Sequence, residues 1–284
     1  MVEDIPEFSI VERASYVFLC ASPFLAFVLA AIRVLRVPGL HVVLGIAVFF
    51  MFATALWMLG GRAMRSQNPE SRLVAMAGIL LVLPFALMAL LWVGLGPPWV
   101  ATAAENQMRY VVLVMMAAAV VGGFVTLKEA LNLADERFYT TLGFAGIMIA
   151  SPLYLVGETL LIAASAAHVR TGKVPEVFVS LSEFQDILMF LGGVLTYAAA
   201  AAFAVSLGRV KWIGRGASRT FVAVSVFAIV CLVMRGLQFP DPAMSAPWYT
   251  EPGFIAGIPA VPFIVPCLLG VASLGRKNRG QARL

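Results

Sequence analysis

Residues 140–166 read TTLGFAGIMIASPLYLVGETLLIAASA and contain one carboxylic acid, Glu158, and no basic side chain. A helix of about twenty residues is long enough to cross the roughly 30 Å hydrocarbon core of a bilayer. In lipid, a helix also satisfies its own backbone hydrogen bonds. An apolar run of this length is therefore typical of a membrane-spanning helix, and it predicts an integral membrane protein.

Comparable apolar blocks recur along the whole chain. Its 284 residues are 61% hydrophobic and 12% charged, whereas soluble domains are about half apolar and about a quarter charged. We therefore predict an all-α fold, with residues 1–284 forming a single integral membrane domain built as a bundle of eight transmembrane helices. The predicted spans are residues 15–32, 40–61, 73–95, 110–127, 140–166, 185–207, 219–236 and 254–274.

Basic residues divide unequally between the two ends of these spans. One side collects fourteen Lys and Arg residues, namely Arg13, Arg62, Arg65, Arg72, Lys128, Arg137, Arg209, Lys211, Arg215, Arg219, Arg276, Lys277, Arg279 and Arg283. The other side collects six, namely Arg33, Arg36, Arg109, Arg170, Lys173 and Arg235. Because cytoplasmic loops of membrane proteins are enriched in Lys and Arg, this bias predicts that both termini are cytoplasmic.

The residues that usually mark metal, haem or nucleotide chemistry are sparse. Cys20, Cys231 and Cys267 all lie in apolar blocks without CxxC spacing, and the two histidines, His41 and His168, lie near outer span ends. The sequence contains no P-loop, HExxH or GxSxG motif. Its basic residues are confined to short loops and the C-terminus. We therefore predict no cofactor, no metal and no nucleic-acid partner, with membrane lipids as the surroundings.

Glu158 is the acid that lies well within a predicted span. A charge at the centre of such a helix costs about 2.5–3.5 kcal/mol on insertion scales, so an intramembrane acid is a functional hypothesis by default. Its carboxyl group must carry a proton or pair with a cation. Tyr154 lies one turn earlier on the same helix face. The available cations are Arg235 and Arg109, at the outer ends of their spans.

Other polar residues cluster at the outer side of the same predicted bundle. Gln185 and Asp186 open the sixth span there, so their side chains are expected near those of Glu158 if the helices pack together. We interpret the set as a ligand-binding site in an outward-facing polar pocket. The alternative is a buried acid or ion pair that only fixes helix packing. The candidate residues are Glu158, Tyr154, Arg235, Asp186, Gln185 and Arg109.

Four short blocks in the second half of the chain suggest a relationship to known proteins. They are residues 105–107 (ENQ), residues 131–136 (LNLADE), Ser206 followed by residues 211–213 (KWI), and residues 265–271 (VPCLLGV). From about residue 105 to residue 271 the chain resembles a family of small bacterial polytopic membrane proteins of unknown function. The resemblance implies an all-helical fold in the bacterial inner membrane. At two positions where the family is expected to have an Arg and a Glu, this sequence has Ala145 and Ile149. The resemblance therefore implies no ionic feature there.

Three classes of function remain open from the sequence. The first is binding or transport of a small molecule, ion or lipophile at the outward-facing pocket around Glu158. The second is an accessory or structural subunit that docks on another membrane protein through faces rich in alanine and glycine. The third is an intramembrane enzyme that uses Glu158 or Asp186 as a general acid on a lipid-soluble substrate. The sequence identifies neither a substrate nor an oligomeric state.

Overall fold

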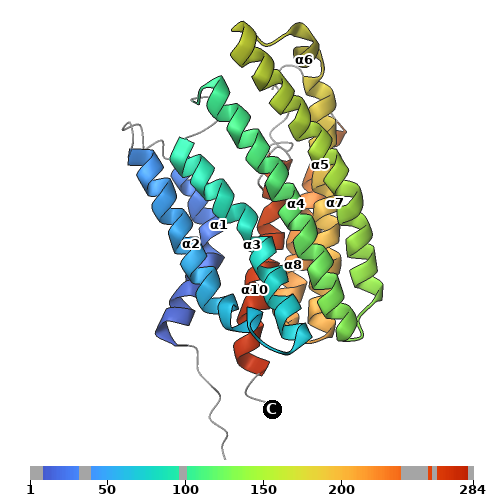
Figure 1. Ribbon diagram of the computed structural model, residues 1–284. Coiled ribbons are helices and arrows are strands. Elements are labelled where there is room, and N and C mark those ends of the chain that lie inside the picture. The colour runs from blue at the N-terminus through green and yellow to red at the C-terminus, as the bar shows by residue number, and fades with distance from the viewer. Residues whose placement is uncertain (1–8, 32–39, 96–100, 238–254, 258–260, 281–284) are drawn as a thin grey trace, which may run out of the picture.

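The computed structural model describes residues 9–31, 40–95, 101–237, 255–257 and 261–280 (Figure 1). Every regular element in these ranges is a helix, so the predicted all-α class is confirmed. The elements are α1 (Ile10–Ala31), α2 (Leu40–Met64), α3 (Pro69–Leu95), α4 (Ala103–Leu133), α5 (Phe138–Thr171), α6 (Glu176–Ser180), α7 (Ser182–Arg209), α8 (Arg215–Gly236), the 3-10 turn η2 (Val261–Phe263) and α10 (Ile264–Gly280).

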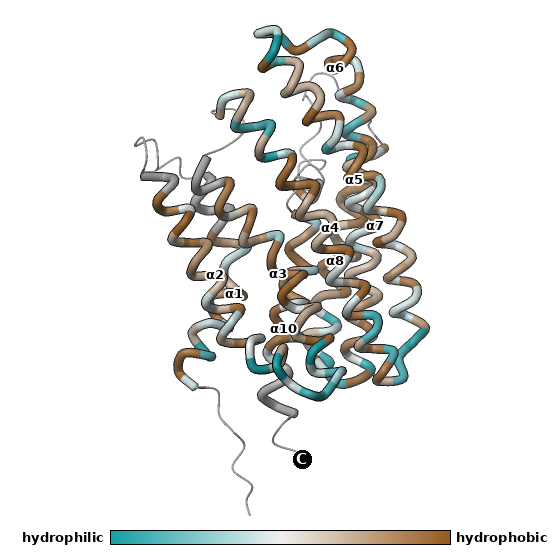
Figure 2. Tube along the Cα trace, in the orientation of Figure 1, coloured by the Kyte–Doolittle hydropathy of each residue, from teal (hydrophilic) through white to brown (hydrophobic). Residues whose placement is uncertain are grey.

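Six helices within the described ranges are long and apolar enough to cross a membrane. They comprise Val43–Met64, Pro69–Met88, Ala103–Leu133, Phe138–Thr171, Glu176–Arg209 and Arg215–Gly236, while Val261–Gly275 is apolar but shorter. Figure 2 shows the matching distribution of hydropathy, with apolar residues along the helices and polar residues gathered near their ends. The chain is therefore an all-helical, multi-pass membrane protein.

Helix α4 extends beyond both ends of the fourth predicted span, residues 110–127. Helix α4 begins at Ala103 rather than near residue 110, because Thr102 and Glu105 form a capping box. The Thr102 hydroxyl accepts a hydrogen bond from the Glu105 amide at 3.3 Å, and the Glu105 carboxylate accepts one from the Thr102 amide at 2.7 Å. These two bonds satisfy amide groups that a helix start otherwise leaves without partners.

The last predicted span, residues 254–274, is not one continuous helix in its described part. A 3-10 turn at Val261–Phe263 precedes α10, which begins only at Ile264. Proline lacks an amide hydrogen and is tolerated in the first turn of a helix but not in its interior. Pro266 occupies such a first-turn position, and Pro262 lies in η2. Residues 254 and 258–260 lie outside the described residues.

Consecutive long helices pack against one another, and the last helix closes the bundle. The chain order places α2 against α3, α3 against α4, α4 against α5, α5 against α7, and α7 against α8. Helix α10 departs from this order and packs against α3 (Figure 1). Helix α1 contacts α2, α3 and α10. The C-terminal helix thus joins the first half of the chain to the second half.

Close approach of α3 and α10 depends on two facing glycines. A methyl group added at Gly78 would lie 2.5 Å from Leu274 Cγ and 2.9 Å from the carbonyl oxygen of Gly270. A methyl group added at Gly270 would likewise lie 2.9 Å from the carbonyl oxygen of Gly78. Small residues that let helix backbones approach are a principal means of helix association in membranes.

We predict that Gly78→Ala destabilises the protein by about 1–3 kcal/mol, because overpacking forces the two backbones apart. Unfolding in detergent, followed by circular dichroism, measures the loss. The matched control is Gly122→Ala, since a methyl group there would meet only Leu80 Cδ1 at an ordinary 3.5 Å. Equal stability of the two variants would show that the α3–α10 contact is not tightly packed.

Two turns lie at the same end of the bundle as residues 65–68, which connect α2 to α3. We call this end the turn end. The two turns join α4 to α5 (residues 134–137) and α7 to α8 (residues 210–214) (Figure 1). Each turn contains a residue that is not glycine in the left-handed conformation, Asp135 with φ 60° and Lys211 with φ 59°. The residues that follow bond back to the preceding helix, Glu136 N to Leu131 O at 3.1 Å and Trp212 N to Leu207 O at 2.8 Å. This bonding is typical of helix C-termini that glycine usually closes.

We predict that Lys211→Gly raises the free energy of unfolding by about 0.5–1 kcal/mol, because glycine adopts the left-handed conformation without steric cost. The same replacement at Lys173, which does not have a positive φ, is the control. Lys173→Gly should leave stability unchanged or lower it, since glycine increases the entropy of the unfolded chain. The prediction fails if both variants move the unfolding midpoint in the same direction.

Candidate functional site

Glu158 lies on α5 in the interior of the protein. The whole residue is only 3% exposed. Its Oε2 atom accepts no hydrogen bond from any described residue. At about 1.5 Å per residue, Glu158 lies roughly 30 Å along α5 from Phe138. The acid is therefore buried toward the end of the bundle opposite the turn end, which we call the far end.

Tyr154, one turn before Glu158, packs into the contact between α5 and α7. Its ring lies against the backbone of Gly192, where an added methyl group would come within 3.1 Å of it. The Thr196 hydroxyl donates a hydrogen bond to the Gly192 carbonyl at 2.8 Å and lies 3.4 Å from the Tyr154 hydroxyl, from which it can accept one. The Phe263 ring of η2 lies 5.2 Å from the Tyr154 ring, centroid to centroid. Tyr154 thus fixes the position of α5 beside α7.

Helix α4 packs against α5 and carries Arg109 and Tyr110 in its first two turns. Arg109 is 2% exposed and interacts electrostatically with Tyr110 and Glu105. Tyr110 is half-buried. The described residues contain no ion pair between Glu158 and Arg109, although both residues are buried.

Gln185, Asp186 and Arg235 lie at the far end as well, but they face different neighbours. Gln185 lies beside Gly157, where an added methyl group would be 3.8 Å from Gln185 Cγ. Asp186 interacts electrostatically with Arg235. The Arg235 guanidinium lies against Gly257, where an added methyl group would be 3.1 Å from Nη1. Of the six predicted residues, Tyr154 lies one turn before Glu158 on α5, Gln185 lies against Gly157 of the same helix, and Asp186 and Arg235 interact with each other.

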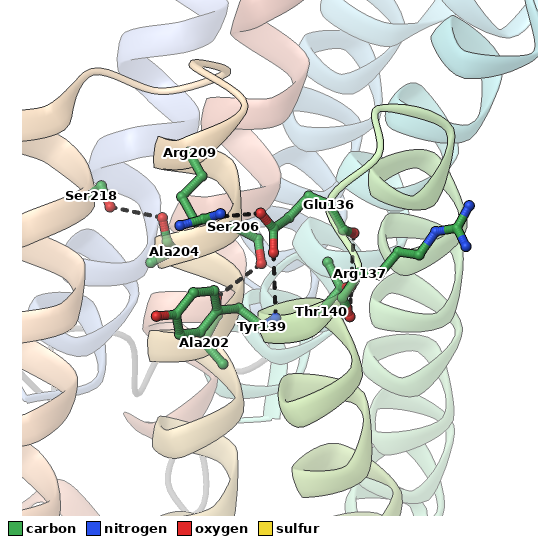
Figure 3. Close-up of polar contacts among 9 residues, drawn as sticks. All are labelled: Glu136, Arg137, Tyr139, Thr140, Ala202, Ala204, Ser206, Arg209 and Ser218. Carbon is green, nitrogen blue, oxygen red and sulfur yellow. Dashed lines mark hydrogen bonds and ion pairs between the residues drawn. The ribbon is translucent and has the colours of Figure 1, made fainter.

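A second buried acid, Glu136, lies at the turn end and has a partner (Figure 3). Its carboxylate accepts a hydrogen bond from Arg209 Nε at 2.7 Å, and the Glu136 side chain is 7% exposed. The Tyr139 amide donates to the other carboxylate oxygen at 3.4 Å. The Arg209 guanidinium also lies 5.5 Å from the centroid of the Tyr139 ring. This ion pair joins the start of α5 to the end of α7.

Hydroxyl groups around this ion pair complete the same contact region. Thr140 donates to the Glu136 carbonyl at 3.0 Å, and Ser218 of α8 donates to the Ala204 carbonyl of α7 at 2.8 Å (Figure 3). Sequence reasoning did not single out Glu136 or Arg209 as a pair, since 73 positions separate them. Glu136 does close the 131–136 block quoted for the family resemblance, and Arg209 lies in the segment that joins Ser206 to residues 211–213.

The described residues contain no group of three or more His, Cys, Asp or Glu side chains that could hold a metal ion. Besides Glu158, the far end carries Asp186 paired with Arg235, and Arg109 paired with Glu105. Such a set can bind a proton or one positive charge at Glu158, or act as a hydrogen-bond donor when protonated. Comparison of the chain with family models, curated proteins and solved structures finds no match.

We predict that Arg209→Gln lowers the thermal unfolding midpoint, because it leaves the buried Glu136 carboxylate without its cation. In a double-mutant cycle with Glu136→Gln, the combined loss should be smaller than the two single losses added together. Arg137→Gln is the control, since Arg137 is 77% exposed and only 3.9 Å from an exposed Asp135. Additive losses in the cycle would mean that the two side chains act independently.

Proposed function

We propose that this protein binds a proton or a small cationic ligand at Glu158, and that this binding is part of transport across the bacterial inner membrane. The observation that carries the proposal is the buried carboxyl group of Glu158, whose Oε2 atom accepts no hydrogen bond from a described residue. Buried polar groups are normally hydrogen-bonded, and an exception calls for an explanation such as a functional role. A reversible proton or cation supplies the missing partner.

The contrast with Glu136 supports this reading of Glu158. Glu136 is buried to a similar degree but is neutralised by Arg209, so it meets the ordinary requirement for a buried charge. An acid that served only to fix helix packing would be expected to have such a partner. Glu158 occupies the same helix pair, α5 and α7, yet its carboxyl group is left available for a ligand.

The orientation that we propose has eight spans, both termini in the cytoplasm and Glu158 nearer the outer surface. The turn end carries most of the basic residues of the described loops, namely Arg65, Arg137 and Lys211, and Arg215 opens α8 there. The positive-inside rule assigns that end to the cytoplasm. Because Glu158 lies roughly 30 Å farther along α5, we propose that the site faces the periplasmic side of the membrane.

We predict that dicyclohexylcarbodiimide, a lipophilic reagent that modifies protonated carboxyl groups, labels Glu158 in membranes or mild detergent. Peptide mass spectrometry locates the N-acylurea adduct. Glu158→Gln should abolish this labelling and still yield a folded protein, because glutamine preserves shape and removes only the ionisable group. The control is Glu176→Gln on α6, which should leave labelling of Glu158 unchanged.

The proposal is rejected if the wild-type protein is not labelled at Glu158. It is also rejected if Glu158→Gln behaves as the wild type in proton-release and ligand-uptake measurements on reconstituted vesicles. A loss of folding in Glu158→Gln is distinguished by size-exclusion chromatography, and Glu158→Asp then serves as the second variant, since aspartate retains a carboxyl group that can be labelled.

A further inference from the structure

We propose that the outward surface of α2 at the turn end binds an anionic phospholipid. The phosphate group of this lipid contacts Arg65 and Arg62, and its acyl chains lie along apolar side chains of the same helix. The site uses no residue of the far end, so the inference is independent of the function proposed for Glu158. It depends on an aromatic ring that lies over a glycine, on the arginine that covers this ring, and on the exposed apolar surface beside them.

Trp57 and Gly61 lie in the last two turns of α2, and Arg65 directly follows the helix. The three residues are spaced four positions apart, so they follow one another along one helix face. A methyl group added at Gly61 would lie 3.0, 3.2 and 3.3 Å from Cδ2, Cε2 and Cε3 of Trp57. Because these atoms adjoin the bond shared by the two indole rings, a face of the indole lies over Gly61. Glycine at this position leaves the space that the ring occupies.

The guanidinium group of Arg65 is held on this ring. Its Cζ atom lies 4.8 Å from the centroid of the Trp57 ring, which is within the range of a cation–π contact. Contact with the face of a ring leaves the N–H groups of the guanidinium as donors for another partner. A guanidinium group binds two phosphate oxygens at once with matching geometry. Arg65 on Trp57 therefore forms a preorganised phosphate-binding group.

Arg62 supplies a second positive charge. It precedes Arg65 by three residues and therefore lies on the same side of the helix. Both arginines are exposed, and neither forms an ion pair with an acidic side chain within the described part of the chain. Two positive charges without acidic partners favour a lipid headgroup with a net negative charge over a zwitterionic one.

The apolar surface of α2 favours a lipid over a free anion. Phe50, Met51 and Trp57 are 63%, 53% and 57% exposed, and all three belong to the membrane-spanning segment Val43–Met64. Exposed apolar side chains of such a segment contact hydrocarbon, while Trp and Arg near its end lie at the level of the lipid headgroups. A phospholipid matches both parts of this surface, whereas inorganic phosphate matches only the arginines.

Native mass spectrometry of the full-length protein in detergent measures the dissociation constant of the first bound lipid. The probes are dioleoylphosphatidylglycerol and dioleoylphosphatidylethanolamine, which have the same acyl chains. We expect the phosphatidylglycerol to bind more tightly, and Arg65→Gln to raise its dissociation constant about three- to tenfold. Trp57→Leu should also raise it, because Arg65 loses the ring that holds it. Trp57→Phe keeps an aromatic ring and should remain within about twofold of the wild type.

Arg215→Gln is the matched control, because it removes one exposed arginine from the turn end at the start of α8. It should leave the dissociation constant unchanged. Equal affinity of the wild type for the two lipids overturns the inference, as does wild-type affinity in Arg65→Gln. Equal losses in Arg215→Gln and Arg65→Gln also overturn it, since they would reflect general attraction to positive charge. Wild-type affinity in Trp57→Leu overturns the role of the ring, and retained binding in Trp57→Phe separates loss of the ring contact from a folding defect.

Discussion

The absence of water from the hydrocarbon core is the constraint on which this structure depends. Each polar group placed there must find a partner within the protein. The backbone meets the requirement by forming helices. Several side-chain hydroxyls in the helices meet it by bonding back to a carbonyl one turn earlier, as Thr126 does to Gly122 at 2.7 Å and Ser273 does to Leu269 at 2.8 Å. Such groups therefore add no functional information.

A carboxylate cannot be satisfied by a carbonyl of its own helix and needs another partner. The two buried acids, Glu136 and Glu158, differ in whether such a partner is present. Glu136 is matched by Arg209 and by the Tyr139 amide, which ties the start of α5 to the end of α7. Along the rest of this contact the two helices keep one antiparallel register, with Gly143 against Phe203 and Gly157 against Met189. The ion pair and the small residues together hold α5 and α7 in place, so Glu158 remains buried although its Oε2 atom accepts no hydrogen bond from a described residue.

The helix turn that carries Glu158 is fixed by packing. Tyr154 anchors this turn against α7, where its hydroxyl lies 3.4 Å from that of Thr196. For the binding that we propose at Glu158, preorganised neighbours would lower the entropy cost. An electrostatic contact is also stronger in a medium of low polarity than in water.

The sequence by itself determined the helical membrane fold and the acid most worth examining. The length of each apolar block reflects bilayer thickness, and the cost of an intramembrane charge makes Glu158 conspicuous within residues 140–166. The capping box is also encoded locally, in residues 102–105. That α4 begins there was not predicted from the sequence.

Only the tertiary structure decided which polar groups meet. Arg209 and Glu136 are 73 positions apart, and whether two such side chains face each other depends on helix rotation and on the register of α5 against α7. That register is set by the fit of particular side chains against glycines, which hydropathy does not encode. The same packing brought Asp186 of α7 near Arg235 of α8. Apolar blocks of similar composition do not by themselves show which of their faces pack together.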